Sequence, residues 1–103
     1  IEADPILVAT GRKPMTEGLN LQAAGVEVDS HGAIVVNGYL HTTAPNIWAM
    51  GDVKGGLQFT YISLDDYRII RDDLFGNKER TADDRNPVAY SVFIDPPLTR
   101  RTD

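Results

Sequence analysis

The stretch Thr43-Ala44-Pro45-Asn46-Ile47-Trp48-Ala49-Met50-Gly51-Asp52 leads from an apolar segment into a glycine and a carboxylate. The apolar residues 47–50 predict a short strand, because such runs are typical of strands buried on both faces. Gly51 has no Cβ, so a ligand can approach the backbone closely at the end of this strand. Asp52 can accept hydrogen bonds from sugar hydroxyls. The stretch therefore suits a nucleotide site, although taken alone it is more often a plain turn between a strand and a helix.

A helix is predicted directly after this turn, over about residues 58–75. The residues Phe59, Ser63, Tyr67, Ile70 and Leu74 recur at helical spacing, which places them on one face. Residues 76–77, Gly-Asn, predict its end. The helix start, near residues 57–60, offers free N–H groups and the positive end of the helix dipole, which favour an anion or a developing negative charge.

The rest of the chain predicts a mixture of short strands and turns. Strands are expected at residues 6–9, 26–28 and 33–36, with a single helical turn at residues 19–24. The charged residues 78–86 lack apolar periodicity and predict a linker, and alternation in residues 88–94 predicts a further strand. The pattern as a whole indicates an α/β fold.

Composition restricts the classes of function. The 103 residues carry a net charge of −5 with a pI of about 4.8, which disfavours nucleic acid or an anionic membrane as a partner. No apolar run approaches the roughly 20 residues that span a bilayer, and no signal peptide opens the chain. The chain has no cysteine, which excludes a disulfide framework or a thiolate metal site within it. Because the chain enters a core-like strand so soon after Ile1, we expect it to be a segment of a larger protein.

Several other residues are assigned ordinary structural roles. His31 and His41 lie in turn or loop contexts without a visible partner, so neither is predicted to be a base or a metal ligand. The acidic pairs are expected to lie on solvated surface, since they lack the ligand spacing of a calcium loop; they are Asp65-Asp66, Asp72-Asp73 and Asp83-Asp84. Trp48 is expected to pack in the core.

Two stretches together resemble a known family. Residues 43–52 resemble the second FAD-binding motif of the pyridine nucleotide–disulfide oxidoreductases, which include lipoamide dehydrogenase, glutathione reductase and mercuric reductase. Upstream, Ile6-Leu7-Val8-Ala9-Thr10-Gly11-Arg12-Lys13-Pro14 resembles the strand that returns from the NAD(P) domain of that family to its FAD domain. Two signatures in this order and at this separation are much more specific than either alone. The resemblance runs from about Asp4 to the end of the chain.

The resemblance implies four cofactor contacts. Asp52 would bind the FAD ribitol, and Gly51 would permit close approach of the FAD. The backbone of Thr60 would lie at the flavin ring, on the first turn of the helix. Gly11 would lie near the nicotinamide nucleotide, at the seam between the two dinucleotide domains.

Two aromatic residues flank Thr60, and the resemblance places Phe59 and Tyr61 at the border of the flavin ring. Many relatives have a different polar residue in place of Tyr61. Residues 56–68, 87–93 and 96–98 further resemble the bacterial branch linked to reactive-chlorine resistance and metal-ion reduction, close to mercuric reductases. No catalytic residue and no metal ligand is expected in this chain.

The resemblance also implies a domain organisation. Residues 1–77 would form the C-terminal half of an FAD/NAD(P)-binding Rossmann-like domain, residues 78–86 a linker, and residues 87–103 the first strand of an α+β dimerisation domain. The chain contains neither the Gly-x-Gly-x-x-Gly loops of the family nor its redox-active cysteine pair.

The expected whole protein is a cytoplasmic homodimer that uses NAD(P)H and FAD to reduce a disulfide, a metal ion or a related acceptor. The segment alone is expected to be inactive. The alternative is a non-catalytic small binding or dimerisation module.

Overall fold

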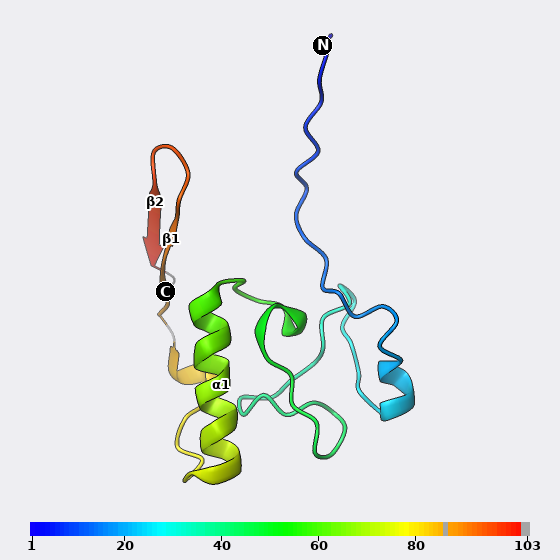
Figure 1. Ribbon diagram of the computed structural model, residues 1–103, viewed down its shortest axis with the longest axis vertical. Helices are drawn as coiled ribbons and strands as arrows, with labels where there is room; N and C mark the ends of the chain where they lie inside the picture. The colour runs from blue at the N-terminus through cyan, green and yellow to red at the C-terminus, as the bar shows by residue number, and fades with distance from the viewer. Residues whose placement is uncertain (86, 102–103) are drawn as a thin grey trace.

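The computed structural model describes residues 1–85 and 87–101. Its elements follow in the order η1 (Leu21–Ala24), η2 (Gly51–Lys54), α1 (Thr60–Phe75), η3 (Ala82–Arg85), β1 (Ala89–Val92) and β2 (Leu98–Arg101). In Figure 1, α1 stands beside a body of loops, whereas the blue N-terminal segment and the orange-to-red hairpin extend away from that body. Residue 86, in the predicted linker, and residues 102–103, at the end of the predicted dimerisation segment, lie outside the described residues.

The helix α1 confirms the predicted helix, but its most buried residues are not those of the predicted apolar face. The buried residues are Ile62, Asp66, Ile69 and Asp73, again at helical spacing. Tyr67 and Leu74, from the predicted face, are each 48% exposed. Hydrophobic periodicity does not reveal this face, because two of its four residues are carboxylates that are buried through polar partners.

A small core lies within the loops. It is formed by Val26, Ile34, Ala44 and Ala49, with Leu21, Val36 and Val53 packed against them. The expected strands at residues 26–28, 33–36 and 47–50 are reduced to two single antiparallel bridges, Val28 with Ile34 and His41 with Trp48. The loops therefore pack through side chains and turn hydrogen bonds more than through a sheet.

The predicted strand at residues 6–9 does not form. Ile6, Leu7 and Val8 are 83%, 90% and 76% exposed, and the segment projects from the body (Figure 1). A strand requires a neighbour to satisfy its backbone N–H and C=O groups, and none lies against this segment within the described residues.

The C-terminal region forms a hairpin. β1 confirms the strand predicted at residues 88–94, in shorter form, and pairs antiparallel with β2 from Ala89 opposite Arg101 to Val92 opposite Leu98. β2 was not predicted. Between α1 and the hairpin, Ala82 N–H donates to Gly38 O at 2.8 Å, so the charged segment before the hairpin packs against the body. The result is a small α/β structure with a two-stranded sheet.

Candidate functional site

The turn after residues 47–50 is the short helix η2, which begins at Gly51. Gly51 has a φ of +76°, in the left-handed region that glycine adopts without strain. A Cβ at this position would lie 3.1 Å from Ser63 Oγ on α1. Two features of the structure therefore favour glycine at position 51: the positive φ and the nearby side chain of Ser63. The close approach of a cofactor, predicted from the sequence, would be a third.

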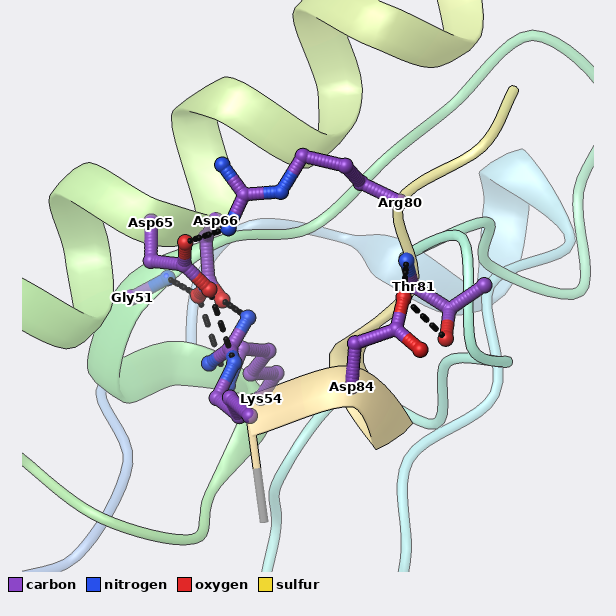
Figure 2. Close-up of polar contacts among 8 residues, drawn as sticks. Gly51, Lys54, Asp65, Asp66, Arg80, Thr81 and Asp84 are labelled. Atoms are coloured by element: carbon purple, nitrogen blue, oxygen red, sulfur yellow. Dashed lines mark hydrogen bonds and ion pairs between the residues drawn. The ribbon is translucent and has the colours of Figure 1, made fainter. Parts of the chain in front are cut away.

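The buried carboxylate of Asp66 holds this turn against α1. Gly51 N–H donates to Asp66 Oδ2 at 2.8 Å, and Lys54 Nζ lies 3.3 Å from the same oxygen. Arg85 Nη2 donates to Asp66 Oδ1 at 2.5 Å. Figure 2 shows Asp66 reaching from α1 toward Gly51 and Lys54. The expectation that Asp65-Asp66 is solvated surface is therefore wrong for Asp66, whose side chain is fully buried.

Asp65, by contrast, is partly exposed and binds two arginines. Arg80 Nη2 donates to its Oδ1 at 2.5 Å. Arg85 Nε lies 3.0 Å from its Oδ2, in an ion pair without the alignment of a hydrogen bond. The charged segment after α1 is thus attached to α1 through the Asp65-Asp66 pair. The sequence shows the charges, but not which carboxylate faces inward.

Asp52 is exposed and lines a cavity of about 310 Å³. Arg12, Lys13 and Gln58 also line this cavity. A cavity at the lower end of the size range of small-molecule sites suits one portion of a dinucleotide rather than a whole one. A carboxylate beside a lysine and an arginine also matches a ligand that combines hydroxyls with anionic groups.

The start of α1 is open to a ligand. Thr60 is its first residue and is exposed. The residue before it, Phe59, is extended and makes no side-chain capping hydrogen bond, while its carbonyl accepts from Ile62 N and Ser63 N. The first N–H groups of a helix have no partner within the helix, so an anion or a polar oxygen can satisfy them.

Phe59 and Tyr61 face the hairpin. Their rings are stacked, with centroids 5.2 Å apart and an interplanar angle of 8°, and Phe59 also lies 5.0 Å from the ring of Tyr90 on β1. Tyr61 Oη donates to Ala89 O at 3.2 Å. Burial raises the pKa of Tyr61, and the neighbouring Tyr90 raises it further. The two residues predicted to border a flavin ring thus also join the helix start to β1.

Gly11 lies apart from this group. It has a φ of +120° and open space where a Cβ would project, and it belongs to the exposed N-terminal segment. Its neighbour Arg12 reaches the cavity of Asp52, but Gly11 does not line that cavity. The structure therefore brings Gln58, two residues before α1, to the cavity of Asp52, whereas Gly11, Phe59, Thr60 and Tyr61 do not line that cavity.

A second polar cluster corrects the prediction that His41 has no partner. His41 Nε2 lies 2.5 Å from Asp73 Oδ2, and Trp48 Nε1 donates to the same oxygen at 3.0 Å. Burial raises the pKa of Asp73, but the hydrogen bonds from His41 and Trp48 and the charges of His41 and Lys78 outweigh it and leave the pKa below its ordinary value. Asp73 is thus also buried rather than solvated, and Trp48 is only half-buried.

Two other kinds of site are absent from the part of the chain that the structure describes. No group of three or more histidine, cysteine, aspartate or glutamate residues there could hold a metal ion. No helix among residues 1–85 and 87–101 has the length and apolar character needed to cross a membrane.

Comparison with known proteins defines the class of this chain. Residues 1–66 match the profile of the family described as pyridine nucleotide-disulphide oxidoreductase. That match covers more than half of the chain, so the chain belongs to this family.

Particular relatives share much of the sequence. The chain is 61% identical over 100 residues to the probable pyridine nucleotide-disulfide oxidoreductase RclA of Escherichia coli (strain K12), covering 97% of this chain and 23% of that protein. It is 46% identical to a mercuric reductase of Staphylococcus aureus, covering 81% of this chain and 15% of that protein. It is 38% identical to a glutathione reductase of Burkholderia cepacia, covering 93% and 21% respectively. The chain thus spans less than a quarter of the length of these relatives.

Solved structures agree with these relationships. The HOCl-induced flavoprotein disulfide reductase RclA from Escherichia coli, in its Cu(II) complex, matches with a TM-score of 0.86 and 62% identity, over 90% of this chain and 22% of that one. The same flavoprotein described without copper matches with a TM-score of 0.85. At this identity the resemblance extends beyond the fold to the family, and it supports the predicted similarity to the reactive-chlorine branch.

Proposed function

We propose that the chain is a flavin-binding segment of an NAD(P)H-dependent FAD oxidoreductase. The observation that carries the proposal is the exposed carboxylate of Asp52 at a cavity that it shares with two cationic side chains, within the turn η2, which is anchored to α1. In this proposal Asp52 binds the ribitol hydroxyls of FAD and Gly51 allows the cofactor close to the backbone. FAD supplies the redox chemistry when it is bound.

The start of α1 gives the proposal its second support. The N–H groups of the first turn, at Thr60, lie at the positive end of a 16-residue helix without a side-chain cap. Such an end stabilises negative charge on a nearby group. The backbone at Thr60 would therefore stabilise the negative charge of the reduced flavin ring. Phe59 and Tyr61, at the same end, would border the ring, and Gly11 would lie near the nicotinamide nucleotide.

The whole protein is proposed to reduce a disulfide, a metal ion or a related acceptor. Relatives named as a mercuric reductase, a glutathione reductase and a flavoprotein disulfide reductase support this range of acceptors. We further propose that residues 1–77 complete an FAD-binding domain and that residues 87–103 begin a dimerisation domain after a connector at residues 78–86. The protein would then act as a cytoplasmic homodimer, and the segment alone would be inactive.

The test is to purify the full-length protein that carries this chain and to record its absorption spectrum during anaerobic addition of NADH and, separately, NADPH. A bound flavin that is bleached by one of the nucleotides is the expected result. A colourless full-length protein, or a flavin that neither nucleotide reduces, would overturn the proposal. Sequencing the gene upstream of the codon for Ile1 separates this proposal from a stand-alone module, because only the enzyme requires the glycine-rich loop and the cysteine pair there.

A further inference from the structure

We infer that Asp66, a residue outside the flavin motif, is a positioning residue that sets the orientation of Asp52 for the cofactor. This inference rests on the proposed function and extends it to a side chain 14 positions further along the chain. Asp66 does not line the cavity of Asp52. It acts through Gly51, the residue directly before Asp52.

The N–H group of Gly51 depends on Asp66 for its hydrogen bond. Gly51 is buried, so water does not replace a missing partner for its N–H group. The carboxylate of Asp66 accepts this hydrogen bond at 2.8 Å, and its own side chain is fully buried. A hydrogen bond to a charged acceptor is stronger than one to a neutral acceptor. The orientation of the Gly51 peptide is therefore fixed from the helix side.

The Gly51 peptide in turn controls the position of the Asp52 side chain. Gly51 holds a φ of +76°, and Ser63 of α1 occupies the space beside its Cα. Asp52 follows Gly51 directly in the chain. A rotation of the backbone at Gly51 therefore moves the Asp52 carboxylate relative to the other residues that line the cavity. A displacement of a binding group by about 1 Å is enough to weaken a polar contact severely.

Ion pairs also tie Asp66 to the turn. Asp65 and Asp66 together face Lys54, Arg80 and Arg85, and Figure 2 shows Lys54 and Arg80 approaching this acidic pair. Lys54 belongs to η2 itself, and only 10% of its side chain is exposed. Removing the charge of Asp66 would leave this ammonium group buried without its partner, which favours movement of η2 toward solvent. Asp66 thus holds both ends of the four-residue turn.

The experiment compares Asp66→Asn with Asp83→Asn in the full-length protein. The two substitutions remove the same charge, but Asp83 is exposed on η3. We expect Asp66→Asn to raise the Kd for FAD about tenfold or more, as the loss of a charge-assisted hydrogen bond predicts, and Asp83→Asn to leave it unchanged. Hydrogen exchange at residues 51–54 in the flavin-free protein should become faster in Asp66→Asn only.

A third variant separates positioning from a general loss of stability. Arg85→Met removes the partner of Asp66 Oδ1 and leaves the contact of Oδ2 with Gly51. We expect it to lower the Tm while the Kd for FAD stays near that of the unmodified protein. If Asp66→Asn does not fold, Asp66→Glu takes its place, because it keeps the charge and displaces the carboxylate by one methylene. It should weaken FAD binding as well.

Three results would overturn the inference. They are a folded Asp66→Asn, or Asp66→Glu in its place, that binds FAD as tightly as the unmodified protein; unchanged exchange at residues 51–54; or equal losses of affinity in Asp66→Asn and Arg85→Met at equal losses of Tm. An unmodified full-length protein that binds no FAD overturns the proposed function instead, while the exchange measurement still decides whether Asp66 fixes the turn.

Discussion

His41 and Asp73, which are 32 positions apart, meet through a contact of 2.5 Å between Nε2 and Oδ2. Trp48 donates to the same oxygen, so α1 is fastened to the loop that carries residues 41–48. This contact and the Gly51–Asp66 hydrogen bond lie on the same face of α1, seven residues apart. The helix is therefore held against the loops by two carboxylates.

The first prediction is a loss of stability in acid that depends on Asp73. Its folded-state pKa is below the ordinary value of 3.8, so its contribution is fully present above that value and is lost as the pH falls through the folded-state pKa. Asp73→Asn should lower the free energy of unfolding by about 1–3 kcal/mol at pH 7 and should reduce the slope of stability against pH below about pH 4. Urea unfolding of the full-length protein at several pH values measures both quantities, and an unchanged slope would contradict the assignment.

The second prediction concerns the space beside Gly51. Gly51→Ala should destabilise the protein by about 1–3 kcal/mol, because it strains a positive φ and places a Cβ against Ser63 Oγ. Gly18→Ala is the matched control, since Gly18 has a φ of +83° with open space around it. Thermal unfolding should show a larger loss for Gly51→Ala, and adding Ser63→Ala should restore part of it. Equal losses at the two glycines would show that the Ser63 contact does not matter.

The third prediction concerns the aromatic contacts between α1 and β1. Phe59→Leu removes the stacking with Tyr61 and the contact with Tyr90, which together are worth about 1–2 kcal/mol. Amide exchange of residues 89–92 should become faster, because the hairpin loses its ring contact with the helix start. Phe75→Leu is the control, since Phe75 is 85% exposed and lies at the other end of α1. Unaltered exchange in Phe59→Leu would mean that the hairpin is held elsewhere.

The fourth prediction concerns the 103-residue chain produced by itself. Its segment Ile6, Leu7 and Val8 is exposed and has the composition of a buried strand, so it offers an unpaired edge. We expect self-association and weak or no FAD binding. Val8→Lys should shift the chain toward the monomer, whereas Glu2→Lys should not, as measured by light scattering after gel filtration. A monomer that binds FAD stoichiometrically would refute this expectation.

The sequence predicted the parts of the fold that depend on local signals. The helix α1, the turn at Gly51 and the strand β1 were predicted because periodicity, a glycine and alternating residues act over a few positions. The strand at residues 6–9 was predicted from its composition, but strand formation also needs a partner, which the described residues do not provide. The reverse holds for β2. Residues Leu98–Arg101 have little of the alternation that predicts a strand, but they form one by pairing with β1.

The candidate site was predicted only in part for the same reason. Gly51 and Asp52 stand out because a motif names them. In the sequence, Asp66 and Asp73 resemble ordinary surface carboxylates, and their burial depends on partners that are distant along the chain. The partners of Asp66 are Gly51, Lys54 and Arg85. The partners of Asp73 are His41 and Trp48. The sequence does contain one indication of this burial. Asp66 and Asp73 recur at helical spacing with Ile62 and Ile69, which places all four residues on one face of α1.

The proposed function depends on the binding of a flavin nucleotide by the carboxylate of Asp52. The most direct measurement is the flavin content of the full-length protein with Asp52→Ala, determined by absorbance after gel filtration and compared with Asp83→Ala. This role of Asp52 predicts that Asp52→Ala loses most of its FAD while its far-ultraviolet circular dichroism is unchanged, and that Asp83→Ala keeps its FAD. Full flavin occupancy in Asp52→Ala, with an unaltered Kd for FAD, would contradict it.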